Sequence, residues 1–354
     1  MKMMSLVKYT NIMFNSIGGE DIKMLKIYTA EQNEEWDKIV DNEIIHFTRN
    51  YCKAFMEHGD GEPVLFYLEN KYSKAYQIMF KRKIETSLGE YYDLISPYGY
   101  GGWIIEGEYD SSLFNEYIEY CQENNIVCEF ERFDLFRTDI SKYYGDIKFI
   151  SHNVVKKVDV SDEEIFDDME RRARKNIRKA LKNELSVLID ENLEYMDKFK
   201  EIYYSTMDRN NASDSYYFNE DFFNTLTREN CKLFHVISDN EIISTELVIY
   251  DKLCSYSYLG GTIDEFFNLR PNELLKYEIM KWSHKQGLRY FVLGGGYGGD
   301  DGIFNYKKGL APHNIYNFYV GSRIFNEEIY NQLCDEKEVG QESTFFPRYR
   351  SVLK

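Results

Sequence analysis

The chain has 354 residues, a length that suits two ordinary domain cores better than one. Hydrophobic residues make up 43% of it and charged residues 29%, as in folded globular proteins. The net charge of −17 argues against a protein that coats nucleic acid by bulk electrostatics. No apolar run reaches the roughly eighteen residues of a membrane-spanning helix, so we expect no membrane insertion.

The N-terminal segment and the cysteines indicate a cytoplasmic protein. Residues 1–23 lack the continuous apolar core and cleavage site of a signal peptide, and a natural domain start follows at Met24, which predicts a loose extension. The six cysteines have neither C-x-x-C spacing nor nearby histidine pairs. We therefore expect buried reduced thiols, with no metal site and no disulfide framework.

The first half of the chain predicts an α/β module. Apolar residues recur at helical spacing in two places, strand-like runs lie around and between them, and glycines crowd one turn. The predicted elements are a helix with Trp36, Ile39 and Val40, strands at 64–68 and 75–80, a turn at 98–102, a helix with Phe114, Tyr117 and Ile118, and a strand at 126–130.

A basic helix opens the second half. Ser161 and Glu164 have the spacing of a capping box, ahead of one helix whose apolar line runs from Ile165 to Ala180. Seven basic residues and no acidic residue occupy 171–182. This segment is either an anion-binding surface or an ordinary solvated helix face, and the sequence leaves both open.

The elements that follow have a clear order of helices, an antiparallel meander, one amphipathic helix and one strand. Pro271 suits the first turn of that amphipathic helix and Gly287 suits its end. The first half repeats this order faintly, so we predict mixed α/β sheets in two diverged domains, 24–155 and 156–322. The remaining elements are a helix with Leu193, Met196, Phe199 and Ile202, a helix from Asn219, strands at 232–238, 244–250 and 254–259, a helix over 271–286 and a strand at 290–293.

The start of the 271–286 helix is a candidate anion site. Free N–H groups and the helix dipole favour an anion at a first turn, and Arg270 adds a planar charged fork beside it. Thr262 and Asn272 could supplement Arg270 in holding a donor phosphate. The alternative is an ordinary pair between Arg270 and a carboxylate such as Glu273.

A glycine-rich loop at 294–302 precedes a second candidate site. Five of residues 294–299 are glycine, and the alternating segment 303–308 that follows fixes Lys307 as part of a strand or of the start of a helix. A phosphate-binding P-loop, a nucleophile elbow and a zinc-protease motif are all excluded. A flexible solvent loop with surface ion pairs is the alternative.

Several ordered strings resemble the Fem family of peptidoglycan-bridge aminoacyltransferases and its GNAT relatives, most strongly after residue 165. Segment 270–293 also resembles the acyl-donor motif of GNAT enzymes. The strings are RRARKNIRKALKN (171–183), YYSTMDRNNASDSYYFNEDFF (203–223), YLGGT (258–262), RPNELLKYEI (270–279), LGGG…DGIFNYKKGLAP (293–312) and SPYGYGG (96–102).

The resemblance implies two GNAT-like acyltransferase domains around a cleft, with segment 323–354 packing back on the first domain. The family moves an amino acid from aminoacyl-tRNA to a muropeptide, while relatives use acyl-CoA and sugar acceptors. In the family pattern Lys307 lies at the active site and stabilises negative charge. We expect direct attack on the donor, because no nucleophile–base pair is evident.

Further site residues are predicted around Lys307. Asp301, or Glu246 on the central strand, is the candidate base. Five side chains are expected to line the substrate cleft. They are Tyr98, Tyr100, Tyr217, Tyr258 and Arg209.

Two departures from the family pattern keep the donor open. The basic arm that some members use is missing, which weakens the case for tRNA as a partner. The loop at 268–272 lacks the paired glycines of a coenzyme-A site. The alternative function is a non-catalytic GNAT pair that binds nucleotide- or lipid-linked glycans.

Overall fold

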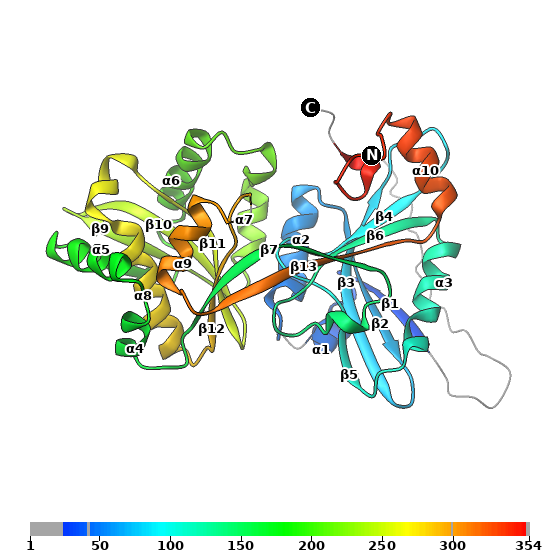
Figure 1. Cartoon of the computed structure of the whole chain (residues 1–354), viewed down its shortest axis with the longest axis horizontal. Helices are drawn as coiled ribbons and strands as arrows, with labels where there is room; N and C mark the ends of the chain where they lie inside the picture. The colour runs from blue at the N-terminus through cyan, green and yellow to red at the C-terminus, as the bar shows by residue number, and fades with distance from the viewer. Residues whose placement is uncertain (1–23, 41–42, 299, 352–354) are drawn as a thin grey trace. The chain divides into compact units, whose positions relative to one another are not determined.

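The computed structural model describes residues 24–40, 43–298 and 300–351, which form two compact units (Figure 1). The N-terminal unit contains 24–40, 46–149 and 319–351, and the C-terminal unit contains 43–45 and 150–318. Strands β7 (Asp146–Lys157) and β13 (Ile315–Ile324) each begin in one unit and end in the other. The extension predicted over 1–23 lies outside the described residues. The domain limits 24–155 and 156–322 stay a prediction.

The N-terminal unit is a mixed sheet with helices packed on it. The strand order is β1-β2-β3-β4-β6-β13, with β5 paired to β3, and only β4 and β6 run parallel. Helices α2 and α10 and strands β1, β4, β5 and β13 were not predicted. The elements are β1 (Met24–Thr29), α1 (Asn33–Val40), α2 (Arg49–His58), β2 (Glu62–Glu69), β3 (Ser73–Lys83), β4 (Tyr92–Ile95), β5 (Ile104–Gly107), α3 (Asn115–Glu123), β6 (Ile126–Arg132) and α10 (Glu327–Glu336).

The C-terminal segment is joined to this unit through one buried carboxylate. Asp93 is fully buried and accepts a hydrogen bond from Arg82 Nε at 2.7 Å and from Tyr349 Oη at 3.0 Å. Arg350 donates to the same carboxylate. Helix α10 also packs on β6. The described part of segment 323–354 therefore contributes to the core of the N-terminal unit.

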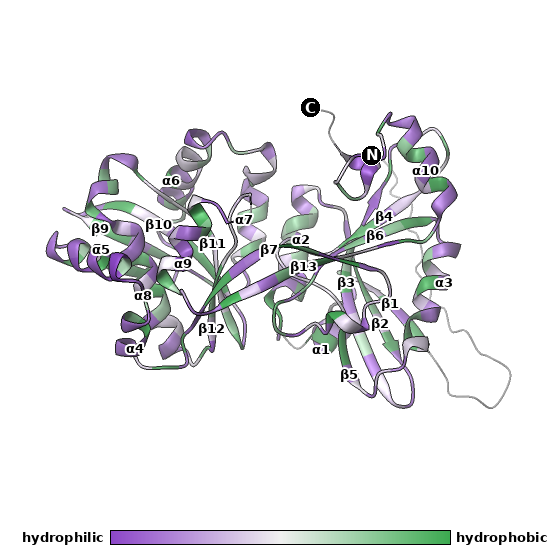
Figure 2. Cartoon of the chain, in the orientation of Figure 1, coloured by the Kyte–Doolittle hydropathy of each residue, from purple (hydrophilic) through white to green (hydrophobic). Residues whose placement is uncertain are grey.

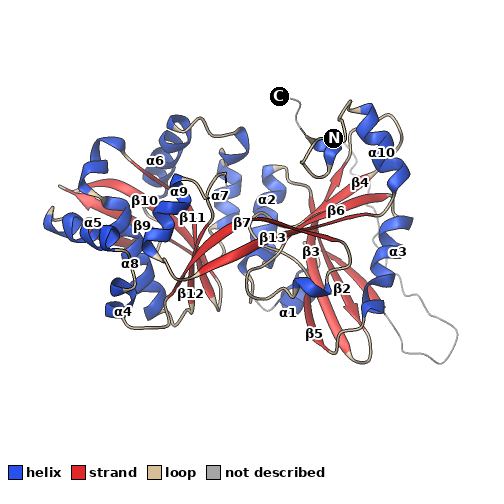
Figure 3. Cartoon of the chain, in the orientation of Figure 1, coloured by secondary structure: helices blue, strands red, loops and turns tan. Residues whose placement is uncertain are grey.

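The C-terminal unit is a second mixed sheet. The strand order is β7-β12-β11-β10-β9-β8, and only β11 and β12 run parallel. Along the chain, helices α6 and α7 precede three consecutive strands, β9, β10 and β11 (helices blue and strands red in Figure 3). The elements are α4 (Asp162–Asp167), α5 (Arg171–Lys182), β8 (Ser186–Asp190), α6 (Met196–Arg209), α7 (Glu220–Leu226), β9 (Cys231–Ser238), β10 (Glu241–Tyr250), β11 (Cys254–Thr262), α8 (Pro271–Lys285), β12 (Tyr290–Gly294) and α9 (Gly302–Leu310).

Strand β11 has an open edge that positions the site. It pairs with β12 only over residues 254–256, although it continues to Thr262. Across the sheet Glu246 faces Gly260 and Thr245 faces Gly261, so the two glycines lie on opposite faces. A Cβ on Gly261 would lie 2.5 Å from Thr206 Oγ1, which explains how α6 comes so close to this strand.

One local prediction in this unit needed correction, and the structure decided between two alternatives for another segment. The single helix expected from Ile165 to Ala180 is two helices, because the backbone of Glu170 is extended (φ −57°, ψ 148°) and breaks the run. Its capping box and apolar line are confirmed, since Ile165 and Ala180 are both fully buried. Segment 303–308, whose alternation also suited a strand, is helical.

The cysteines are buried thiols, as expected from the sequence. All six cysteines are buried and free of disulfides. Within the described ranges, every helix is too short or too polar to cross a bilayer.

Candidate active site

A pocket of about 480 Å³, which we call the β11 pocket, lies at the open edge of β11 in the C-terminal unit. Side chains from β10, β11, α6, α8 and α9 line it. Lys307, the predicted catalytic residue, is among them. Its Nζ donates to the Gly295 carbonyl at 2.7 Å, so the glycine loop and α9 fix each other. Burial, with repulsion from Lys276, lowers the pKa of Lys307 to about 8.

Asp301 caps the helix that carries Lys307. One carboxylate oxygen accepts the N–H groups of Ile303 and Phe304, both at 2.9 Å, and the other accepts two N–H groups of the glycine loop. These backbone hydrogen bonds lower the pKa of Asp301. A carboxylate held in this way is a poor proton acceptor, and its contacts suit the positioning of α9.

Glu246 is the better-placed carboxylate. It is 3% exposed and lines the β11 pocket. Lys276 donates one hydrogen bond to Glu246 Oε2 and another to Ser257 Oγ, the latter at 2.7 Å. The second oxygen, Oε1, has no hydrogen-bond partner among the described residues. Lys276 and Ser257 were not predicted from the sequence. Lys276 could have been inferred, because it lies four residues after Asn272 and therefore on the same face of the helix.

The three residues predicted to hold a donor phosphate line different pockets. Thr262 and Asn272 line the β11 pocket, where Thr262 Oγ1 donates to Asn272 Oδ1 at 2.9 Å and contacts Ser244 Oγ at 2.7 Å. Arg270 has a left-handed backbone (φ 67°) and lines a second pocket. As a phosphate-binding group, the trio stays a prediction.

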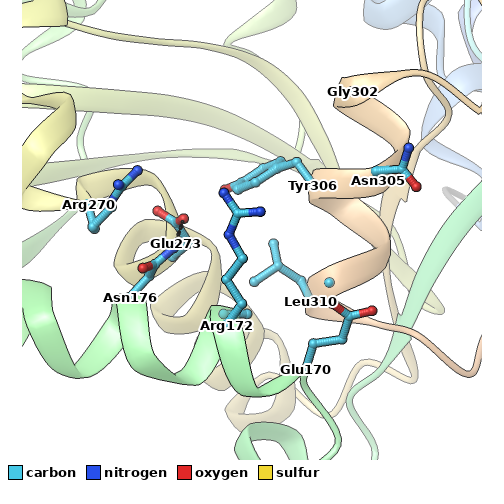
Figure 4. Close-up of a pocket in the computed structure, with 11 residues that line it drawn as sticks. Glu170, Arg172, Asn176, Arg270, Glu273, Gly302, Asn305, Tyr306 and Leu310 are labelled. Atoms are coloured by element: carbon cyan, nitrogen blue, oxygen red, sulfur yellow. Dashed lines mark hydrogen bonds between the residues drawn. The ribbon is translucent and has the colours of Figure 1, made fainter.

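This second pocket, the α5 pocket, has a volume of about 390 Å³ and lies among α5, α8 and α9 (Figure 4). Tyr306 lines both pockets. Its hydroxyl oxygen is buried without a hydrogen-bond partner among the described residues. Burial, followed by the charges of Glu273 and Glu246, raises the pKa of this hydroxyl.

The predicted cleft residues are divided between the two units. Tyr258 and Arg209 line the β11 pocket, and the Arg209 guanidinium lies 5.1 Å from the centre of the Phe267 ring. Tyr217 donates to Asp208 at 2.7 Å. The other two, Tyr98 and Tyr100, belong to the N-terminal unit.

Helix α5 is largely hydrophilic (purple in Figure 2) and carries the seven basic residues seen in the sequence. Arg174 pairs with Asp167 at 3.8 Å, and Arg178 lies over the Phe166 ring. The other five basic residues have no ion-pair partner in the described part of the chain. They are Arg171, Arg172, Lys175, Lys179 and Lys182.

The site lies in a region that matches a known domain family. Residues 168–308, which lie in the C-terminal unit, match the acetyltransferase (GNAT) domain family. No curated protein sequence matches the chain.

Solved structures share the fold over most of the chain. FemX aligns with a TM-score of 0.62 at 15% identity, covering 87% of this chain and 99% of that one. The C-terminal DUF2156 domain of a putative lysylphosphatidylglycerol synthetase from Agrobacterium fabrum aligns with a TM-score of 0.54 at 10% identity, over 85% of this chain and 92% of that one. L-PGS from Bacillus licheniformis aligns with a TM-score of 0.51 at 12% identity, over 82% of this chain and 93% of that one. The predicted mixed α/β fold of the FemX type is confirmed.

Proposed function

We propose that the chain transfers an acyl or aminoacyl group to an amine of a cell-envelope precursor or sugar. The observation that carries the proposal is the convergence of Lys307, Lys276 and Glu246 in the β11 pocket. All three residues lie within the GNAT-matching region. A pocket with fixed charges and a free carboxylate oxygen suits a reaction in which charge develops and a proton moves.

The proposed step is direct attack of the acceptor amine on the carbonyl carbon of the bound ester or thioester. A C–N bond forms, and the C–O or C–S bond to the donor breaks. Glu246 Oε1 takes the proton that the amine loses and passes it to the leaving alkoxide or thiolate, which returns Glu246 to its carboxylate form. Lys307 neutralises the negative charge that develops on the carbonyl oxygen. Asp301 has a positioning role, since it caps the helix that holds Lys307.

Both candidate donors, acyl-CoA and aminoacyl-tRNA, keep support. Thr262 and Asn272 face the donor in the β11 pocket, and Arg270 holds a substrate phosphate from the α5 pocket. The name of the lysylphosphatidylglycerol synthetase denotes a lysyl-bearing product, which supports an aminoacyl group. The glycine-poor loop before α8 weighs against a tightly held pyrophosphate.

One feature favours the binding-module alternative. Glu273 lies in the first turn of α8 and is buried, and a carboxylate there weakens an anion site. A GNAT pair that binds a glycan-linked precursor without turnover would tolerate this. The fixed position of Lys307 in the β11 pocket favours catalysis over this alternative.

The test is a transfer assay with the purified chain, labelled acetyl-CoA or aminoacyl-tRNA, and a panel of muropeptide and amino-sugar acceptors, read by mass spectrometry. We expect Lys307→Ala to lower the transfer rate by about 10²–10³-fold. Lys308→Ala is the matched control, because Lys308 is the next residue of α9 and is exposed. Full activity of Lys307→Ala would contradict the mechanism, and a failure of every donor would favour the binding module.

A further inference from the structure

The α5 pocket brings opposite charges together without pairing them. Two guanidinium groups and two carboxylates line it. Within the described part of the chain, no ion pair joins any of the four to an opposite charge. They are Arg172, Arg270, Glu170 and Glu273.

Glu273 is the least satisfied of these groups. It is 9% exposed, and among the described residues its one hydrogen-bond partner is the neutral amide of Asn176, which donates to Oε1 at 2.7 Å. Tyr306 also lines this pocket. After burial, the charge of Glu273 contributes to the raised pKa of the Tyr306 hydroxyl. A buried carboxylate without a cation is costly, so a cationic ligand group would be stabilised here.

The two guanidinium groups favour the opposite charge. Arg172 projects from α5 toward Tyr306, and Arg270 lies beside the first turn of α8 (Figure 4). Guanidinium forks bind phosphate oxygens well, and the first turn of a helix adds favourable N–H groups. Leu310 and the Tyr306 ring add apolar surface to the lining of the pocket.

We propose that the α5 pocket binds a small phosphorylated amine, with its phosphate between Arg172 and Arg270 and its ammonium group on Glu273. A plain polyphosphate or nucleic-acid backbone is disfavoured, because both carboxylates would repel it. This inference rests on the proposed function in one respect, the assignment of a substrate phosphate to Arg270, and it adds the chemical class of that substrate. Amino-sugar phosphates and phosphorylated amino alcohols share this chemistry.

Isothermal titration of the full chain with three matched probes tests the site. O-phosphoethanolamine carries both charges, ethyl phosphate lacks the amine, and ethanolamine lacks the phosphate. We expect O-phosphoethanolamine to bind at least about tenfold more tightly than either other probe, because each charged end gains a charge-assisted hydrogen bond.

Two variants assign the ends of the ligand. Glu273→Gln keeps an acceptor for Asn176 but removes the charge, so it should abolish the preference over ethyl phosphate. Arg172→Gln should weaken both phosphate probes. Lys179→Gln, an exposed residue of the same helix without an ion-pair partner, should change neither.

The outcomes separate this site from the transfer chemistry. Equal binding of O-phosphoethanolamine and ethyl phosphate, an unchanged preference in Glu273→Gln, or no binding of any probe overturns the proposal. Lys307→Ala should bind O-phosphoethanolamine like the unmodified chain. If the unmodified chain binds O-phosphoethanolamine as expected but transfers no group in any assay, the binding site is supported and only the transferase function is contradicted.

Discussion

The β11 and α5 pockets share the Tyr306 side chain but treat charge differently. In the β11 pocket Lys276 and Glu246 form a direct ion pair, and Lys307 donates to a carbonyl. In the α5 pocket the guanidinium groups and carboxylates are held apart. The difference suggests that the first pocket is organised before a substrate arrives, whereas the second is completed by its ligand.

The geometry of α9 makes this difference possible. Residues three or four apart lie on one face of a helix, so neighbouring positions can serve different pockets. Ile303 and Lys307 face the β11 pocket, while Gly302, Asn305 and Gly309 face the α5 pocket. Tyr306 lies at the boundary of the two faces. One short helix therefore forms a wall of both pockets.

The largest expected effect is on stability, from Lys276→Met. This change leaves the 3%-exposed Glu246 carboxylate unpaired, which should lower the free energy of unfolding by about 3–5 kcal/mol. Arg172→Met in the α5 pocket removes no ion pair and should cost less than about 0.5 kcal/mol. Urea unfolding measures both values. Equal costs would break the comparison, and the double variant Lys276→Met/Glu246→Gln should recover part of the loss.

The pH dependence of the two pockets should also differ. Because the pKa of Lys307 is lowered to about 8, its charge is present below that pH and is lost as the pH rises through it. The transfer rate should therefore fall above about pH 8, while binding of ethyl phosphate by the two arginines stays constant from about pH 7 to 9. Lys307→Arg should move the fall to higher pH. A fall in rate that stays at the same pH in Lys307→Arg would contradict this role of the Lys307 charge.

The smallest effect is expected from Tyr306→Phe. The Tyr306 hydroxyl is buried without a partner among the described residues, so its removal should leave the free energy of unfolding unchanged or raise it by up to about 1 kcal/mol. Thermal unfolding measures the change. A clear loss of stability would mean that the Tyr306 hydroxyl forms a hydrogen bond with ordered water at the boundary between the two pockets.

Local features of the fold followed from the sequence. The helix predicted over 271–286 is observed at Pro271–Lys285, because a proline in the first turn and a glycine after the last act within a few residues. The three strands of the meander are also observed, as β9, β10 and β11. The break between α4 and α5 escaped prediction, because the apolar spacing continues across it.

The candidate site was only partly visible in the sequence. Lys307 was assigned from its motif, and that assignment stays a prediction. Arg270 was grouped with Thr262 and Asn272 because they are close in the chain, but it lines the other pocket. The backbone of Arg270 is left-handed, and a sequence pattern does not reveal this conformation for a non-glycine residue.

By itself, the sequence determined most helices of the C-terminal unit, the three strands of its meander, the capping box at Ser161, the acidic balance and the position of the basic helix. Only the tertiary structure decided which charges meet. Glu246, Ser257 and Lys276 lie on three separate elements, and they come together because β10, β11 and α8 pack in one particular register. Periodicity and capping act over a few residues, whereas a pocket and its ion pairs depend on the packing of elements far apart in the chain.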